Sequence, residues 1–519
     1  MEICFISLIE DVGCINLRYL SSYIINNGHT TKLIFLPRYY SEGWTSEESY
    51  RYPFPDHILE QIEDICKTSD IIGISLMSCH FDNAVHITKY LKKLNKPIIW
   101  GGIHPTISPQ ECLEYADMVC VGEGERSIVE LLDSIGYNER SWCVQYSCHC
   151  DYLVGLVDLK CKECKQKYYE IKGIIKNKDQ LISVGKKIEN LDELGSLDYD
   201  FSHQYIYYNN NILNLDIDIL SKCFSSHYYR TSFSRGCVSS CSYCCNNVLT
   251  KIYGGKIQPI RWRSIDKLIE ELKWSKENIK DLKYIDFCDD TFMSRSFEHI
   301  KEFSEKYKKE INLPFIVLST PLAISYDKLK ALSEAGMYNI GIGIQSVYEP
   351  VRKMYRRNET IEQINKSIEI IDKVSKENNK SIEVRYDFIT DNPWGEEKDT
   401  EENIRFAMKL NKPRNIRIFS LVFYHGTELY EIAKTNGFIC DELNNVYRTT
   451  QLSPKSTFMN ELFKLLSMGC PNILIKFLLK FRSKSTVIFL QKFFTKTRKT
   501  SSKTTNIKKF NGKVGEVCE

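Results

Sequence analysis

The stretch RGCVSSCSYCC, residues 235–245, places four cysteines within nine residues, directly after an Arg-Gly pair. Cys237, Cys241 and Cys244 form a C-x3-C-x2-C pattern, and the aromatic residue Tyr243 stands just before the third thiol. Three thiolates can hold three irons of a cubane [4Fe-4S] cluster and leave the fourth iron open. A structural zinc loop and chance clustering are the alternatives. The spacing favours the cluster, because a preceding strand and downstream motifs agree with it.

The composition is that of a globular chain from a reducing compartment. Of the 519 residues, 43% are hydrophobic, which suggests two to four domains. The opening MEICFISLIED lacks a basic region, so no signal peptide is expected, and no apolar run is long enough to predict a membrane span. Twenty cysteines without an export signal predict a cytoplasmic protein, in which clustered thiols hold metal more often than they form disulfides.

Six strand candidates alternate with helix-period segments from about residue 226 onwards. The first, YYRTSFS, leads into the cysteine loop; the others are LKYIDFC, PFIVLS, YNIGIGI, IEVRYDFIT and IRIFSLVF. Six βα units at this spacing predict a barrel or three-quarter barrel. In such folds the chemistry lies at the carboxyl ends of the strands, where the cysteine loop stands.

A second alternating pattern occupies residues 1–135. Its apolar runs are EICFISL, TTKLIFL, DIIGISLM, PIIWGG and MVCVGEG, each followed by a candidate helix. This pattern predicts a five-stranded, doubly wound parallel sheet of the Rossmann-like type. Ligands of such sheets bind beyond the carboxyl ends of the strands. The predicted fold class is therefore α/β, with a Rossmann-like sheet, a partial barrel and a helical C-terminal region.

These patterns divide the chain into four parts. Residues 1–135 form the first domain, and residues 136–225 form a polar linker rich in Cys and Tyr. Residues 226–440 form the partial barrel, and residues 441–519 form a helical, basic region whose end, beyond Thr495, has a disordered composition.

The linker carries a second cysteine pattern, C-x-C-x10-C-x2-C. It is formed by Cys148, Cys150, Cys161 and Cys164. Four soft ligands in two close pairs suit a small tetrahedral zinc knuckle. The first pair is tighter than the usual C-x2-C, so the relic of a lost site is equally compatible with the spacing.

The cysteine loop resembles the signature of the radical S-adenosylmethionine (SAM) enzymes, and the resemblance covers about residues 226–440. In that family the open iron chelates SAM, and an electron from the cluster cleaves it to a 5′-deoxyadenosyl radical. The resemblance implies a [4Fe-4S] cluster on the three cysteines, with SAM as cosubstrate and Tyr243 near the adenine.

Further SAM contacts are implied by the same resemblance. Asp289 and Asp290 in DFCDDTF match an acidic pair beside the SAM amino group. The alternative is that this Asp pair at a strand end serves only to cap the next helix. Gln345 and Ser346 in GIGIQS match a segment that contacts ribose or carboxylate and usually carries Glu. Gln keeps the hydrogen bonding of Glu but not its charge. A buried strand with close glycine packing is the alternative for GIGIQS.

Residues 1–135 resemble the cobalamin-binding domain that precedes many radical SAM cores. The match rests on INLRYLSSYIINNGH, WGGIHPTISPQE and VGEGERSIVELL. It implies cofactor contacts at Ser75, Gly101, Gly102, Glu123 and Gly124, because glycines at strand ends let a flat macrocycle approach the backbone. The D-x-H-x-x-G pattern that supplies a His ligand in many such domains does not occur in the sequence. A base-off cobalamin without a His ligand is therefore implied, and a domain that binds nothing is the alternative.

The two resemblances together imply a cobalamin-dependent radical SAM enzyme. Its expected reaction is methyl transfer from methylcobalamin to an unactivated carbon of a small molecule, such as a natural product or a lipid or tetrapyrrole intermediate. Radical oxidation, cyclisation or rearrangement with the same cofactors is the second interpretation, and a non-catalytic cobalamin or iron-sulfur sensor is the third. A flavodoxin or ferredoxin is the expected electron donor, and no nucleic-acid partner is expected.

The C-terminal region is strongly basic, with fourteen Lys or Arg against three Glu from Ser453 to Glu519. Its segment NELFKLLSMGCPNILIKFLLKFRSKSTVIFLQKFF carries apolar faces at helical spacing with Lys opposite them. A helical cap over the barrel mouth is the first interpretation. A basic amphipathic helix in peripheral contact with an anionic membrane surface is the second.

Overall fold

The computed structural model describes nine stretches of the chain. They are residues 1–9, 12–37, 53–137, 171–223, 227–255, 260–377, 382–411, 414–449 and 454–501. The four linker cysteines predicted as a zinc knuckle, Cys148, Cys150, Cys161 and Cys164, lie outside these residues. A search of the described helices found none with the length and apolar character needed to cross a membrane.

The first sheet has eight strands in the order β6-β5-β4-β3-β1-β2-β7-β8. The five predicted strands are present and mutually parallel. They are β1 (Glu2–Ser7), β2 (Thr30–Phe35), β3 (Ile71–Ser75), β4 (Ile98–Gly101) and β5 (Met118–Cys120). Three further strands come from the segment predicted to be a linker, namely β6 (Ile174–Ile175), β7 (Gln204–Tyr208) and β8 (Asn211–Asn214). The antiparallel pairs β5–β6 and β7–β8 make the sheet mixed, so the prediction of five purely parallel strands was incomplete.

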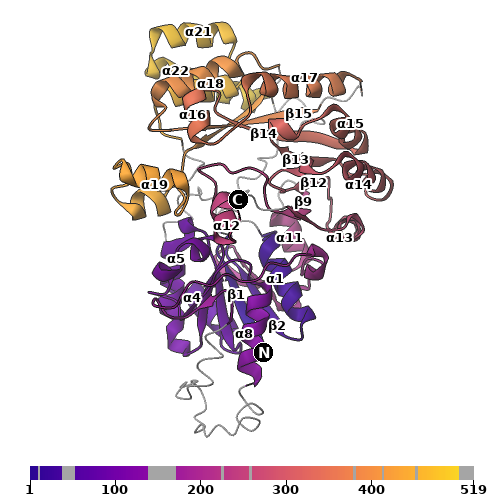
Figure 1. The fold of residues 1–519 in the computed structure, drawn as a ribbon, viewed down its shortest axis with the longest axis vertical. Coiled ribbons are helices and arrows are strands. Elements are labelled where there is room, and N and C mark those ends of the chain that lie inside the picture. The colour runs from indigo at the N-terminus through magenta and orange to yellow at the C-terminus, as the bar shows by residue number, and fades with distance from the viewer. Residues whose placement is uncertain are drawn as a thin grey trace.

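Helices cover both faces of this sheet, as Figure 1 shows. On one face, α1 (Ile15–Asn26) and α8 (Glu125–Tyr137) bury Leu17 and Leu131 against β1 residues such as Ile3. On the other face, α4 (Asp56–Cys66) and α5 (Phe81–Leu91) pack against the alternate residues of the same strand. The short helices of this region are α6 (Ile103–Ile107), α7 (Pro109–Cys112) and α11 (Ile217–Cys223). This two-sided burial produces the continuous apolar runs seen in the sequence.

The second sheet has six parallel strands in the order β16-β15-β14-β13-β12-β9. They are β9 (Tyr228–Thr231), β12 (Tyr284–Phe287), β13 (Phe315–Ser319), β14 (Met337–Gln345), β15 (Glu383–Thr390) and β16 (Asn415–Ser420). All six predicted strands are present in chain order. Because β9 and β16 are the two edges of this sheet, the barrel is open, as the three-quarter-barrel prediction required. A separate antiparallel pair joins β10 (Ser234–Arg235) to β11 (Arg261–Trp262).

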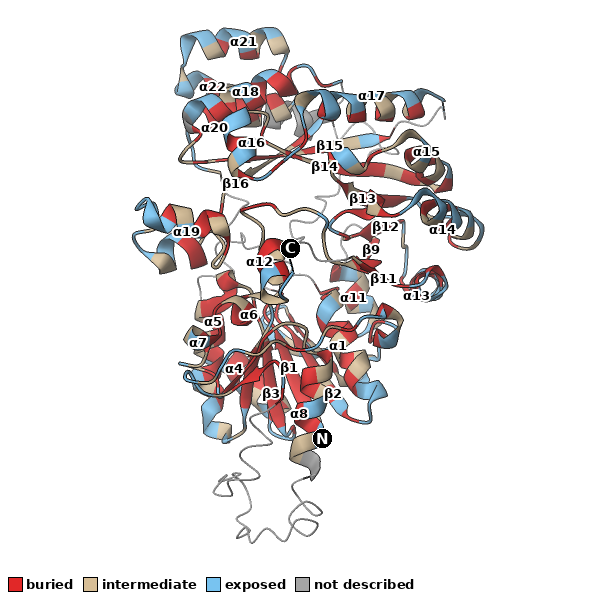
Figure 2. Ribbon diagram, in the orientation of Figure 1, coloured by how far each residue is buried: buried red, intermediate tan, exposed pale blue. Residues whose placement is uncertain are grey.

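Helices connect the strands of the second sheet, and most of them cover its outer side. They are α12 (Cys245–Ile252), α13 (Ile265–Asn278), α14 (Phe297–Glu310), α15 (Tyr326–Ala335), α16 (Glu349–Met354), α17 (Ile361–Glu377), α18 (Glu396–Ala407) and α19 (Glu428–Thr435). Two of them start at a serine that accepts a hydrogen bond from a backbone amide, Ser264 for α13 and Ser296 for α14. Figure 2 shows their buried residues on the side that meets the sheet.

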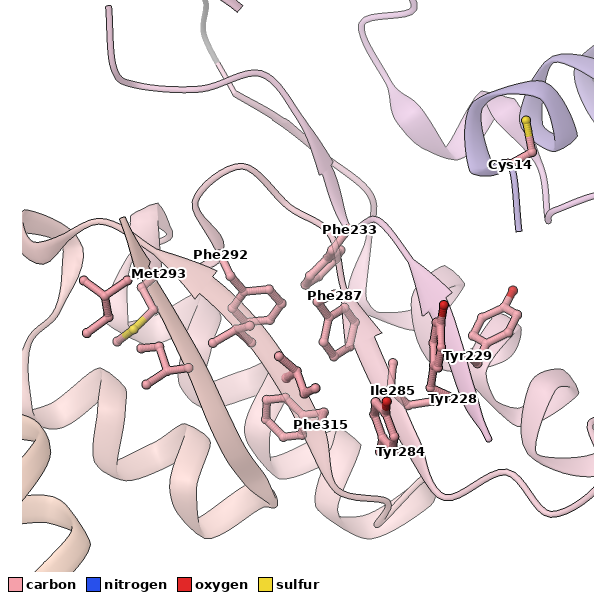
Figure 3. Packing of buried hydrophobic residues seen from close by; sticks show 14 of the residues in the cluster. Cys14, Tyr228, Tyr229, Phe233, Tyr284, Ile285, Phe287, Phe292, Met293 and Phe315 are labelled. Atoms are coloured by element: carbon pink, nitrogen blue, oxygen red, sulfur yellow. The ribbon is translucent and has the colours of Figure 1, made fainter. Parts of the chain in front are cut away.

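An aromatic cluster joins the first strands of the second sheet to their helices. Figure 3 shows Phe287 of β12 among Phe233, Phe292 and Phe315. The Phe287 ring lies 5.0 Å from that of Phe292 and 5.7 Å from that of Phe315, in tilted and edge-on arrangements. These rings are fully buried. Since Phe233 directly precedes the cysteine loop, this packing anchors the start of the loop.

The C-terminal helices are α20 (Phe458–Ser467), α21 (Asn472–Phe481) and α22 (Lys484–Ser501). Helix α20 packs on the second sheet through Phe463, whose ring lies 5.2 Å from that of Phe388 in β15. The Asn460 amide also donates to the Asp391 carboxylate at 2.7 Å. These helices extend the outer helical layer beside α18, whereas the sequence favoured a cap over the barrel mouth.

Candidate cofactor sites

The three cysteines of the C-x3-C-x2-C pattern lie on one loop between β10 and α12. Cys237 follows β10, and Cys244 is the N-cap residue of α12. Cys241 between them is buried, whereas Cys237 and Cys244 are half-buried. The Cys244 amide donates to the Cys241 carbonyl at 3.3 Å, which closes a turn between these two thiols. Cys245 is the first residue of α12, on the other side of the cap.

The surroundings of Cys237 favour the protonated thiol in the absence of a cation. Burial raises the pKa of Cys237, and the negative charge of Asp290 adds to this effect. The Ser239 amide, which donates to the sulfur at 3.4 Å, acts in the opposite direction. Among the described residues, no three His, Cys, Asp or Glu side chains lie close enough to hold one metal ion. In a cubane cluster each thiolate bonds a separate iron, so three cysteines on one loop can hold such a cluster.

A buried arginine that the sequence analysis missed touches the cysteine loop. Arg357 donates from Nη1 to the Cys241 sulfur at 3.8 Å and from Nη2 to the Gly343 carbonyl at 2.5 Å. The same guanidinium pairs with the buried Glu359 at 2.5 Å. Arg357 therefore joins the loop to the end of β14. No sequence pattern marks it, because 116 residues separate it from Cys241.

Tyr243 also lies against the loop. Its ring packs edge-on against Tyr355, with centroids 4.9 Å apart. Burial raises the pKa of Tyr243 well above its ordinary value, and the neighbouring Cys241 adds to the effect, so the phenol is neutral. The ring remains partly exposed, which leaves part of it available to a ligand beside the cysteines.

The two carboxylates after β12 have different surroundings. Asp289 is 1% exposed and accepts hydrogen bonds from the Phe233 amide at 3.1 Å, from Arg295 at 3.0 Å and from the Ser234 hydroxyl. Asp290 is exposed. Desolvation by the neighbouring protein and the charge of Asp289 raise its pKa to about 6, against the opposing effect of a hydrogen bond with Asn246. Asp289 therefore stabilises the start of the cysteine loop, and only Asp290 offers a carboxylate to a ligand.

Gln345 ends β14 in a strained conformation. Its φ is +64°, in the left-handed region that disfavours residues with a Cβ, and the ladder to β15 shifts register there. Its Oε1 atom is buried and has no hydrogen-bond partner in the part of the chain that the structure describes. Strain and an unsatisfied buried oxygen at one residue are typical of a ligand contact. Ser346 differs, because its hydroxyl is buried and donates to Asp399 at 2.5 Å.

The predicted cobalamin contacts of the first domain lie at the carboxyl ends of β3, β4 and β5. Ser75 and Gly101 pair across β3 and β4. Gly102 has a φ of +106°, and a Cβ there would lie 2.7 Å from the Leu76 carbonyl oxygen. Gly101 and Gly124 have room for a Cβ, with nearest atoms at 3.7 Å and 3.5 Å. Of these three glycines, only Gly102 adopts a backbone conformation that requires glycine.

The Glu123 side chain joins the first sheet to the β10–β11 pair that flanks the cysteine loop. Its carboxylate accepts hydrogen bonds from Arg261 on β11 and lies 3.5 Å from Arg235 on β10. The Glu123 amide donates to the hydroxyl of Tyr253, the residue after α12, at 2.7 Å. Glu125 adds an ion pair with Arg235 at 2.8 Å. The Glu123 carboxylate is thus bound by protein groups. A cofactor contact at this position would therefore involve the backbone of Glu123.

These contacts turn the carboxyl ends of the two sheets toward each other. Glu123 follows β5 of the first sheet, whereas Arg235 ends β10, directly before the cysteine loop. A second bridge joins Ser108, in the segment after β4, to His425, in the segment after β16, at 2.8 Å. The loops that bind ligands in each fold therefore face one another, with α12 between the sheets (Figure 1).

The histidines near these loops make internal contacts. His104, fully buried, hydrogen bonds to Ser78 at 3.0 Å, and His29 pairs with Asp133 at 3.1 Å. Burial lowers the pKa of His80 and of His104 to about 3, so both rings are neutral.

The sequence matches two protein families. Residues 5–132 match the B12 binding domain, and residues 231–405 match the Radical SAM superfamily. The first match covers the five predicted strands of the first sheet, and the second covers the cysteine loop and the strands from β12 to β15.

Three known proteins are similar to this chain. Bacteriochlorophyllide d C-8(2)-methyltransferase from Chlorobaculum tepidum is 22% identical over 396 residues, which is 75% of this chain and 73% of the relative. The radical S-adenosylmethionine methyltransferase TsrM from Kitasatospora setae, solved with cobalamin and a [4Fe-4S] cluster, aligns with a TM-score of 0.58 at 12% identity over 84% of this chain and 78% of TsrM. The cobalamin-dependent radical enzyme OxsB aligns with a TM-score of 0.55 at 17% identity over 84% of this chain and 55% of OxsB. At these identities the solved structures show that the fold is shared.

Proposed function

Because residues 5–132 belong to the B12 binding domain family and residues 231–405 to the Radical SAM superfamily, we propose that this protein is a cobalamin-dependent radical SAM methyltransferase. Its cofactors are a [4Fe-4S] cluster, SAM and cobalamin, as these two families imply. The observation that carries the proposal is the opposition of the two sheets, whose carboxyl ends meet at the Glu123 bridge.

The residues present suit these groups. Cys237, Cys241 and Cys244 would hold the cluster, and Arg357 lies against one of these sulfurs. Asp290 offers an exposed carboxylate for the SAM amino group, and Gln345 has an unsatisfied buried oxygen at the strand end where SAM is expected. The same SAM role for Asp289 and Ser346 is not part of the proposal, because protein groups engage both side chains.

A corrinoid suits the opposite edge. Ser75, Gly101 and Gly102 present strand-end backbone with little side-chain bulk, which allows a flat macrocycle to approach. Glu123 and Gly124 would contribute backbone, since the Glu123 carboxylate binds arginines. Because the sequence lacks the D-x-H-x-x-G pattern that supplies a His ligand, the proposed cobalamin is base-off and without a His ligand.

The chain's role is placement. When bound, the cluster and SAM supply a 5′-deoxyadenosyl radical that removes a hydrogen atom from the substrate, and cobalamin carries the methyl group that replaces it. The bridge through Glu123, Arg261 and Tyr253 holds the two cofactor loops at a fixed separation. Such orientation supplies much of the rate enhancement in reactions between bound groups.

The substrate is a small molecule. The relatives are named for a bacteriochlorophyllide and, in one TsrM structure, for tryptophan as substrate. We propose a natural product or a lipid or tetrapyrrole intermediate as the class to test here, with a flavodoxin or ferredoxin as electron donor.

Product stoichiometry under anaerobic conditions tests the proposal. The reconstituted protein, with SAM, cobalamin, reductant and a panel of tetrapyrroles and aromatic amino acids, should form S-adenosylhomocysteine and 5′-deoxyadenosine in equal amounts. A variant with all three cluster cysteines changed to Ala should form no deoxyadenosine and still bind corrinoid. Deoxyadenosine without S-adenosylhomocysteine would favour the oxidation, cyclisation or rearrangement alternative. Corrinoid binding without any SAM cleavage would favour a sensor.

A further inference from the structure

Helix α21 presents an apolar face that the fold does not use. Ile473, Phe477 and Phe481 are 81%, 54% and 60% exposed, respectively. They stand four residues apart on one face of the helix, and the rings of Phe477 and Phe481 lie 4.3 Å apart. The opposite face already anchors the helix, because Ile475 and Leu478 are buried in the core. Packing within the chain therefore does not account for the apolar residues on the exposed face of α21.

The same face is basic. Lys476 and Lys480 are exposed beside the apolar residues, and neither forms an ion pair within the residues that the structure describes. Residues 462–515 contain no Asp or Glu at all. Phe489 on α22, 70% exposed, adds a further ring near this region of the chain. An apolar stripe with lysines and no acidic residue is complementary to an anionic, partly apolar surface.

The position of α21 leaves this face accessible. Figures 1 and 2 place the helix at the end of the molecule opposite to the first sheet, with exposed residues along its outer edge. A helix of ten residues is about 15 Å long, about half the thickness of a bilayer's hydrocarbon core, so it would lie in the interface.

We infer that α21 docks on an anionic lipid surface through its exposed face, here called the α21 face and formed by Ile473, Lys476, Phe477, Lys480 and Phe481. This inference goes beyond the proposed methyl transfer and concerns where the enzyme works. Aromatic and aliphatic side chains would enter the headgroup boundary while lysines contact the anionic lipids. A second copy of the chain is a poorer occupant. A symmetric pair would bring Lys476 and Lys480 of both copies together, and the nearby carboxylates Glu397 and Glu401 already pair with Arg482.

Vesicle flotation of the full-length, anaerobically purified protein tests this inference. The protein should float with vesicles of phosphatidylcholine and phosphatidylglycerol and remain in solution with phosphatidylcholine alone, and added salt should weaken the binding. Changing Phe477 and Phe481 to Ser should abolish flotation. Changing Lys476 and Lys480 to Gln should weaken it about fivefold for each lysine removed.

Matched controls separate this surface from general effects. Lys308→Gln with Lys309→Gln changes two exposed lysines of α14, and Leu181→Ser changes a side chain that is 89% exposed. Both should float as the wild type does. The inference is overturned if wild-type protein ignores anionic vesicles, if the α14 control weakens binding equally, or if the phenylalanine variant converts a dimer to a monomer without changing flotation. SAM cleavage should survive in every α21 variant, so failure here leaves the proposed function intact.

Discussion

The guanidinium of Arg357 lies 3.8 Å from the sulfur of Cys241, inside the protein. The potential of an iron-sulfur cluster depends on its net charge and on hydrogen bonds to its sulfurs. A buried cation bonded to one cluster cysteine therefore favours the reduced state. Arg357 acts through Cys241 and is a positioning residue rather than a catalytic one.

The first prediction concerns the cluster potential. Changing Arg357 and Glu359 together to Gln removes the buried pair without leaving one charge unpaired. Because this double variant removes one positive and one negative charge, the midpoint potential, followed by EPR, should fall through the lost hydrogen bond to the Cys241 sulfur, by up to about 60 mV, which is tenfold in the reduction equilibrium of a one-electron couple. The single variant Arg357→Lys, which keeps a positive charge at this position, should show a smaller fall in the midpoint potential. Arg356→Gln, which alters an exposed residue paired with Glu428, serves as control, and an equal shift there would contradict the assignment.

The second prediction distinguishes the cluster ligands from their neighbour. Cys241→Ala should lower the iron and sulfide content of the reconstituted protein severalfold, because a cluster held by two thiolates is easily lost. Cys245→Ala should keep the full content, since Cys245 starts α12 beyond the loop. Iron and sulfide analysis with EPR measures both. Equal loss in the two variants would place Cys245 among the ligands.

The third prediction concerns Gly101 and Gly102, and it distinguishes a glycine that the backbone conformation requires from one that contacts the ligand. Gly102→Ala should lower the free energy of unfolding by about 1–3 kcal/mol, because its φ is +106° and its Cβ would meet the Leu76 carbonyl. Gly101→Ala should leave urea unfolding nearly unchanged, since its Cβ has room. If the macrocycle approaches this backbone, Gly101→Ala should still weaken cobalamin binding, measured by absorbance titration. Unchanged affinity would remove Gly101 from the site.

The fourth prediction uses the strain at Gln345. Gln345→Gly should raise the free energy of unfolding by about 1 kcal/mol by relieving the left-handed conformation. Gln345→Ala keeps that conformation and should not stabilise. Both variants lose the amide and should bind SAM more weakly in equilibrium dialysis. SAM affinity equal to wild type in both would show that the strain serves packing alone.

The fifth prediction is the acid response of the Glu123 bridge. Burial alone would raise the pKa of Glu123, but hydrogen bonds from Arg261 and the charge of Arg235 outweigh it and hold the pKa below its ordinary value. A lowered pKa stabilises the folded state above the unfolded value, about 4.3, and this stability is lost as pH falls through the folded value.

Glu123→Gln tests this directly. At pH 7 the variant should lose about 3 kcal/mol in urea unfolding, because the buried Arg261 loses its carboxylate partner while Arg235 keeps Glu125, and its stability should fall less below pH 4. Glu114→Gln, at an exposed pair with Lys178, should change stability by less than about 1 kcal/mol. If the free energy of unfolding fell equally with pH in wild type and in Glu123→Gln, other carboxylates would be responsible for the loss of stability in acid.

The strands of both sheets were predictable because each is an apolar run bounded by polar turns. The three added strands of the first sheet were not. Strand β6 has two residues, and β8 is mostly exposed, so neither carries a clear hydrophobic pattern. Strand β7 lies far along the chain from its partner β2, and only the folded chain reveals such a pairing.

Site residues were predictable where the spacing itself carries the chemistry, as in the cysteine loop. Adjacent residues were harder to assign, because sequence does not tell which side chain faces the protein. Asp289 and Ser346 face inward and bind protein groups, whereas Asp290 is exposed and the Oε1 atom of Gln345 has no hydrogen-bond partner among the described residues. The orientation follows from the strand ends and their register, which are tertiary features.

The pairing of β2 with β7 has a consequence for synthesis of the chain. A nascent polypeptide that has reached Tyr137 has made β1 to β5 but lacks the strand that covers β2, whose Leu33, Ile34 and Phe35 become wholly buried in the finished protein. Until about residue 214 has left the ribosome, that apolar edge is open to other growing chains. Ribosome pausing between these points would therefore favour aggregation, and chaperones that shield unpaired edges would matter most there.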